Sequence, residues 1–184
     1  MSIENKIKAL RRLILAHVAF QQVAAACDFL IKHQSDERSQ FYGPFFSGIC
    51  VTYMRPFMSS EGLGPIPSKY SEFPLNTEYA CTHEDLKNGR NWAYAHNSPQ
   101  QAAGLLANEQ EREEQTRIRF EFHEHGLTFS PPEVTWPKSR LPAIAALCGF
   151  QIDRVAPDVD GLLRNLAGSK IYEYGEYIIG ETFP

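Results

Sequence analysis

The sequence lacks the features that mark several classes of protein. Its four cysteines form no CxxC pair and match no zinc-ribbon or zinc-finger spacing. The N-terminus has no apolar stretch typical of a signal peptide, and the uninterrupted apolar runs are shorter than the about 20 residues that a membrane-spanning helix needs. We therefore expect a cytoplasmic protein with reduced thiols and no membrane association. The four cysteines are expected to be buried and to act as small hydrophobic residues; they are Cys27, Cys50, Cys81 and Cys148.

An excess of positive charge is also missing. The chain has 18 Lys and Arg against 22 Asp and Glu, which gives a formal net charge of −4. Such a surface does not bind polyanions in general, so any contact with nucleic acid has to come from a local cationic site. The 184 residues suit one domain, and a hydrophobic content of 43% excludes wholesale disorder. We find no internal repeat and no low-complexity tract.

Apolar residues in steps of three and four predict helices over residues 5–33, 38–58, 77–97 and 139–167. Gly43-Pro44 indicates a kink or a late start in the second of these helices. Pro157 is expected to kink or split the last one. The first helix has a continuous seam formed by Leu13, Ala16, Phe20, Val23, Cys27 and Leu30.

The remaining segments have other patterns. Residues 59–76 are rich in Gly, Pro and Ser and predict a loop, and residues 100–115 predict a short solvated helix. Alternation of apolar and polar residues around Gly126 predicts a β-hairpin over about 117–130. The aromatic tail, residues 169–184, fits a strand, a partner-binding arm or a frayed end. Residues 1–184 are thus expected to form a single, mainly α domain, an up-and-down four-helix bundle with a small added β-hairpin.

The segment from His83 to Asn97 is polar and aromatic where a bundle helix is expected to have a clean apolar stripe. A helix that gives up apolar positions inside a bundle is a candidate site. Arg90 is a permanent cation whose planar fork suits phosphate oxygens, and His96 takes or gives a proton near neutral pH. On a regular helix these two side chains lie about 120° apart and about 9 Å apart along the axis. They converge only if the helix unwinds near His96, or if a second chain supplies the same pair across a two-fold axis.

Residues 90–96, RNWAYAH, resemble the R-N-x-x-x-A-H form of the signature of the HEPN superfamily. The resemblance extends over residues 5–97 and is loose beyond them. It implies a helical bundle that forms a homodimer, with the Arg and His residues of both chains lining a shared cleft. Active members of the superfamily are metal-independent endoribonucleases, often toxins or antiphage defence proteins, so the resemblance also implies RNA as substrate and an antitoxin protein as a partner of some members.

The chemistry of RNA cleavage suits these residue types. His96 is expected to act as the general base or acid for attack by the ribose 2′-hydroxyl on the adjacent phosphodiester. Arg90 is expected to stabilise charge on the phosphate oxygens, with Asn91 orienting one of the reacting groups. Tyr94, one turn after Arg90, is expected to contact the substrate or stack on a base. No metal and no cofactor is required.

Other interpretations of the same residues stay open. A non-catalytic dimer that binds a nucleotide or a protein is favoured by the negative net charge. Arg90 has a structural alternative as the partner of Glu84 or Asp85. A weaker possibility is a metal hydrolase built on His83, Glu84 and His96, although His83 by itself is expected on the surface. The sequence departs from the superfamily pattern in two ways, with Gly89 before the Arg and with an added hairpin. These departures put the arrangement of the dimer in question more than the helical bundle itself.

Overall fold

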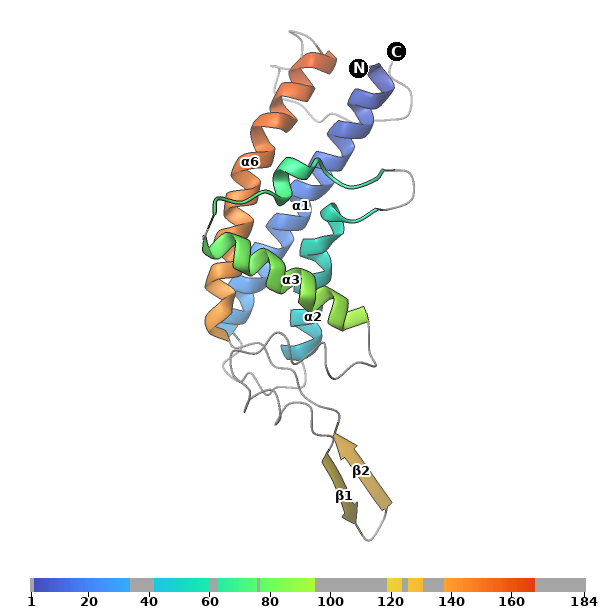
Figure 1. Cartoon of the computed structure of the whole chain (residues 1–184), viewed down its shortest axis with the longest axis vertical. Helices are drawn as coiled ribbons and strands as arrows, with labels where there is room; N and C mark the ends of the chain where they lie inside the picture. The colour runs from blue at the N-terminus through green and yellow to red at the C-terminus, as the bar shows by residue number, and fades with distance from the viewer. Residues whose placement is uncertain are drawn as a thin grey trace.

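The chain is mainly helical in the computed structural model, which describes residues 2–33, 42–59, 63–75, 77–94, 119–123, 126–130 and 138–167. The predicted short helix over residues 100–115 lies outside these ranges. The tail, residues 169–184, which fits a strand, a partner-binding arm or a frayed end, lies outside them as well. Four α-helices lie within these ranges (Figure 1), and three short 3-10 turns named η1, η2 and η4 accompany them. The helices are α1 (Ile3–His33), α2 (Tyr42–Met54), α3 (Glu78–Tyr94) and α6 (Leu141–Ala167).

The first and last helices form the largest helix–helix interface of the fold. α1 and α6 pack against each other extensively and run in opposite directions (Figure 1). The predicted seam of α1 is buried throughout, and α6 supplies the facing residues of the core. Burying such side chains contributes about 1.5–3 kcal/mol each for the larger ones, so this seam accounts for much of the stability. The residues that α6 contributes are Leu141, Ile144, Leu147, Cys148, Gln151 and Val155.

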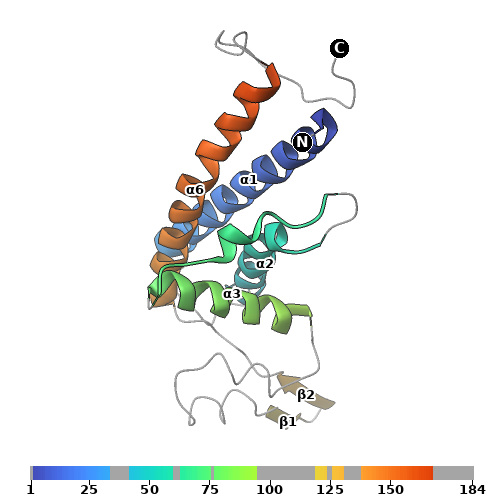
Figure 2. The same cartoon turned by 45° about the horizontal axis from the view of Figure 1, so that its top comes forward.

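The second and third helices complete the core from one side. The described part of α2 begins at Tyr42, two residues before Pro44, and the residues from 34 to 41 lie outside the description, so the late start stays a prediction. After Met54 the chain tightens into η1 (Arg55–Phe57), which contains Pro56. α3 packs against α2 and α6 but lies across them in both views (Figures 1 and 2). In the predicted up-and-down bundle all four helices would instead run side by side.

Pro157 does not split the last helix. α6 follows the short turn η4 (Lys138–Arg140) and continues as one helix through Pro157 to Ala167. Of the two expectations for Pro157, the split is therefore wrong, whereas the kink stays a prediction. Pro157 removes one backbone donor, yet its position is exposed, where water replaces the lost partner.

Two short strands lie between α3 and α6 in the sequence. β1 (Arg119–His123) pairs antiparallel with β2 (Gly126–Ser130). The register places Phe120 opposite Phe129 and His123 opposite Gly126.

α1 is also the one helix among the described residues that is long and apolar enough to cross a membrane. An 18-residue window in it has a mean hydropathy of 1.6, and a third of that window is buried inside the protein. A search for uninterrupted apolar runs overlooks this window because polar residues such as Gln21 and Gln22 interrupt the apolar runs of α1. Core helices pass the same test, so composition alone does not distinguish the two roles.

All four cysteines are free thiols. Cys27, Cys50 and Cys148 are buried, each on a different helix, as expected for small hydrophobic residues. Cys81 is exposed on α3, so the prediction of burial is wrong for this residue. It lies on the outer face because its neighbours Thr82 and His83 take the buried positions.

Candidate functional site

The helix that carries the predicted site packs against the core through one face. Its buried positions are Thr82, His83, Leu86 and Gly89, which follow helical spacing. Burial is ordinary for the apolar Leu86, whereas Thr82 and His83 are polar residues that a core position seldom holds. Gly89 is buried on this face, so the residue that departs from the superfamily pattern lies at a packing position of α3.

Arg90 lies at the edge of that buried face and is partly exposed, while Asn91 is exposed. The Nη1 atom of Arg90 donates a hydrogen bond of 3.1 Å to Oδ1 of Asn91. A guanidinium has five N–H donors, so this bond orients the group without using it up. The two adjacent polar residues of the RNWAYAH segment therefore interact directly, with Asn91 positioning the cation.

The other two predicted site residues are described less fully. Tyr94 is the last residue of α3, and its helical backbone places it one turn beyond Arg90. The Tyr94 side chain and the whole of His96 lie outside the described residues. Convergence of Arg90 and His96 therefore stays a prediction.

The carboxylates proposed as structural partners of Arg90 bind other cations. Glu84 accepts two hydrogen bonds of 3.1 Å from the Lys87 ammonium on the same helix. Asp85 forms an ion pair of 3.2 Å with Arg140, just before α6. Burial raises the pKa of Asp85, and the Arg140 guanidinium opposes that shift. The alternative interpretation paired Arg90 with Glu84 or Asp85, but these carboxylates bind Lys87 and Arg140.

His83 is not a surface residue, and that expectation is corrected. Its side chain is 9% exposed and lies among the rings of Tyr53, Phe57 and Phe73, with ring centroids 5.7, 4.9 and 4.8 Å away. Its Nδ1 atom and the Tyr53 hydroxyl share a hydrogen bond of 2.9 Å. Burial lowers the pKa of His83 to about 4, so the imidazole is neutral at physiological pH.

The burial of His83 also removes support for the metal-hydrolase interpretation. His83 lies in an aromatic cluster, whereas the adjacent Glu84 is exposed and binds Lys87. Within the residues that the structure describes, no three His, Cys, Asp or Glu side chains are placed to hold a metal ion. The third proposed ligand, His96, lies outside them.

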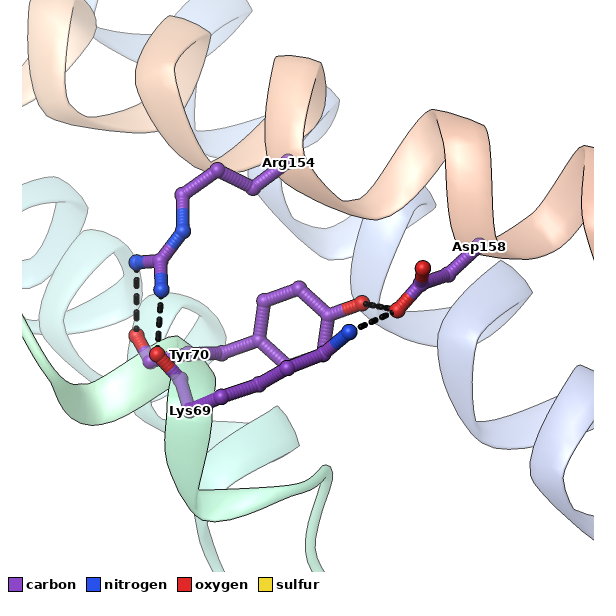
Figure 3. A network of polar contacts seen from close by, with 4 residues as sticks. All are labelled: Lys69, Tyr70, Arg154 and Asp158. Atoms are coloured by element: carbon purple, nitrogen blue, oxygen red, sulfur yellow. Dashed lines mark hydrogen bonds and ion pairs between the residues drawn. The ribbon is translucent and has the colours of Figure 1, made fainter.

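The loop after η1 is fastened to α6, which the sequence did not predict. At its centre is η2 (Ser68–Ser71), where Lys69 and the Tyr70 hydroxyl both bind the carboxylate of Asp158 (Figure 3). Arg154 donates to the backbone carbonyls of Lys69 and Tyr70, and Gln151 donates to the latter at 2.8 Å. We call this set of contacts the η2–α6 clasp.

The clasp also encloses the aromatic cluster around His83. Tyr70 is 1% exposed, and the Arg154 guanidinium lies 5.1 Å from the ring centre of Phe150 and 6.0 Å from that of Phe73. Phe73 in turn contacts His83. A loop predicted only from its Gly and Pro content therefore closes one side of α3. The sequence signal for this role is the presence of two large aromatic residues, Tyr70 and Phe73, in a segment that is otherwise rich in Gly, Pro and Ser.

Comparisons of the chain with protein-family models, with curated proteins and with solved structures found no match.

Proposed function

We propose that this chain is a dimeric HEPN-like protein that binds RNA and cleaves it without a metal ion, acting as a toxin or in antiphage defence in the cytoplasm. The observation that carries the proposal is the RNWAYAH segment, whose Arg90 and Asn91 lie at the surface near the end of α3 and bind each other. The mainly helical fold and the four free thiols are compatible with it.

In the proposed reaction the His96 imidazole removes the proton from a ribose 2′-hydroxyl. The resulting oxyanion attacks the adjacent phosphorus, forms a cyclic phosphate and releases the 5′-oxygen, which takes a proton from an acid. Arg90 stabilises the charge that develops on the non-bridging oxygens, and a charge-assisted bond of this kind is stronger than a neutral one. Asn91 keeps the guanidinium oriented, and Tyr94 contacts a base.

The second candidate function is a non-catalytic dimer that binds a nucleotide or a protein. The net charge of −4 favours it, because a surface without excess positive charge binds long RNA weakly. This function uses the same Arg90 and Asn91 pair to hold a single phosphate or carboxylate.

Cleavage of total cellular RNA in excess EDTA distinguishes the two functions. We expect the purified wild-type protein to cut RNA and the His96→Ala variant to lose at least a hundredfold in rate, since general acid–base catalysis contributes about 10²–10⁴-fold. His33→Ala, at the exposed end of α1, is the matched control and should cut like the wild type.

The same samples are measured by light scattering to determine their mass. An intact wild-type dimer that leaves RNA uncut would contradict the ribonuclease and support the binding function. Equal cutting by His96→Ala and the wild type would contradict the assigned role of His96. Cutting of RNA by a monomer would contradict the part of the proposal in which two chains form a shared cleft.

A further inference from the structure

A groove runs along α1 on the side that faces α2 and η1. It consists of two hollows of about 310 and 350 Å³, and Gln22 lines both of them. The first hollow is lined by Arg12 of α1, by Arg55 of η1 and by apolar residues between them. The second continues along α1 to Ala26 and is bounded by Phe45 and Gly48 of α2. Each volume lies in the range of about 300–1,000 Å³ that is usual for ligand pockets.

The first hollow is positively charged. Within the described part of the chain, no acidic side chain lines either hollow and neither arginine forms an ion pair. The Arg55 side chain is exposed. Arg12 donates from Nη1 to the carbonyl of Pro65 at 3.2 Å, which holds its guanidinium in place, while its Nε has no hydrogen-bond partner in that part of the chain. Two cations therefore lie at one end of the groove, and of these Arg12 is held in place while Arg55 is exposed to solvent.

The rest of the groove is apolar. Leu15 is 55% exposed, and the described residues that line the second hollow are all uncharged. From Arg12 to Ala26 the α1 axis advances about 21 Å at 1.5 Å per residue. Exposed apolar surface of this extent, joined to a charged end, is typical of a binding site.

We propose that this groove binds a single-chain amphiphilic anion, such as a fatty acid, with the anionic headgroup between Arg12 and Arg55 and the chain extending along α1 toward Phe45. The carboxylate or phosphate neutralises the two guanidinium groups, whose planar forks suit its oxygens. The apolar chain covers Leu15 and the wall formed by α2. A nucleotide fits less well because the second hollow has few polar groups to pair with a base edge. The proposal is independent of RNA cleavage.

Laurate below its micelle concentration is the probe, and binding is measured by titration calorimetry on the full chain. We expect saturable binding of laurate and at least tenfold weaker binding of lauryl alcohol, which has the same chain without the charge. Arg12→Gln and Arg55→Gln should each weaken laurate binding by about ten- to a hundredfold, the usual range for hydrogen bonds to a charged group. Lys8→Gln, one turn away on α1 and outside both hollows, removes the same charge and should bind laurate like the wild type.

The apolar half is tested by filling it. A Cβ atom built on Gly48 meets nothing within 4 Å, so a side chain at this position has room to extend toward the second hollow, and Gly48→Leu is the variant that fills it. We expect it to weaken laurate binding at least tenfold with no loss of melting temperature. Gly161→Leu on α6 is the matched control, since its Cβ also has open space and lies in neither hollow.

Three results would overturn the proposal. Equal affinity for laurate and lauryl alcohol would show that the arginines do not recognise a headgroup. Unchanged laurate binding by Arg12→Gln, Arg55→Gln and Gly48→Leu would place the amphiphile elsewhere. Binding to vesicles of phosphatidylcholine and phosphatidylserine, with none to free laurate, would identify the face as a bilayer contact instead.

Discussion

At the scale of single residues, the imidazole of His83 is kept neutral by its surroundings. Burial among aromatic rings disfavours the charged form, the nearby Glu84 carboxylate opposes this effect and the Lys87 ammonium reinforces it. Burial is the largest of the three, which is why the pKa falls to about 4. The polar side chain thereby serves as a hydrogen-bonded part of the core.

The stability of the protein is expected to depend on pH through His83. In the unfolded chain this residue takes up a proton near pH 6.5, whereas in the folded chain it stays neutral down to about pH 4. Its contribution is therefore fully present above pH 6.5 and is lost as the pH falls from 6.5 to 4, by about 2–3 kcal/mol in the free energy of unfolding. Urea denaturation at several pH values measures this slope.

The His83→Gln variant provides the comparison for that experiment. Glutamine keeps a polar group near Tyr53 but does not titrate, so the slope between pH 4 and 6.5 should flatten relative to the wild type. His33→Gln, which removes an exposed imidazole, should keep the wild-type slope. The same slope in His83→Gln and the wild type would mean that other groups cause the acid sensitivity.

At this scale the sequence predicted some site residues and missed others, for a physical reason. The segment around Arg90 stood out because its polarity conflicts with a bundle helix. His83 was expected on the surface, because the rings that bury it come from α2, η1 and the loop after η1, which are remote in the sequence. Arg12 and Arg55 line the same hollow but lie 43 residues apart in the sequence, so no local pattern brings them together.

At the scale of elements, the carboxylate of Asp158 takes part in two different interactions of the η2–α6 clasp. Lys69 reaches Asp158 as an exposed ion pair, with side chains that are 55% and 39% exposed. Tyr70 reaches the same carboxylate from a ring that is fully buried. Together these bonds lower the pKa of Asp158. The buried partner is expected to contribute more, because solvent screens an exposed ion pair.

Two single substitutions test this difference in chemical denaturation. Tyr70→Phe removes the hydroxyl and should lower the free energy of unfolding by about 1–2 kcal/mol, as for a hydrogen bond to a charged group. Lys69→Gln should lower it by less than about 1 kcal/mol, the usual value of a surface ion pair. The reverse order would show that the ammonium, not the phenol, fastens the loop.

The elements themselves were largely predictable. Periodic apolar positions gave three of the long helices to within a few residues. The second helix was predicted to reach residue 58, but α2 ends at Met54 because Pro56 lies just beyond it in η1. The direction of α3 was not predictable from periodicity, because spacing along one helix carries no information on the angle at which it crosses another. The fastening of the loop depends on partners in α6, which are remote in the sequence.

At the scale of the whole molecule, the reactivity of the thiols can show whether the helices unfold together. Cys27, Cys50 and Cys148 are buried on three different helices, and Cys81 alone is exposed. Burial raises the pKa of the Cys27 thiol to about 12 and raises those of Cys50 and Cys148 as well, so none of the three is a thiolate at neutral pH.

Labelling with a thiol reagent at pH 8 should therefore proceed in two phases. We expect one thiol, Cys81, to react at once in the native protein, and the other three to react together at the rate of global unfolding. Cys81→Ser should remove only the fast phase. Separate rates for the three slow thiols would show that the helices open independently and that the core is not one cooperative unit.

The pairing of the first and last helices has a consequence for synthesis on the ribosome. The seam of α1 is translated first, yet its main packing partner, α6, emerges only when most of the chain has been made. Until then the nascent chain presents an apolar helix without its cover, which is the kind of surface that chaperones bind. A chain truncated before α6 should accordingly be aggregation-prone, and stalled translation late in the message should be more damaging than its small number of missing residues suggests.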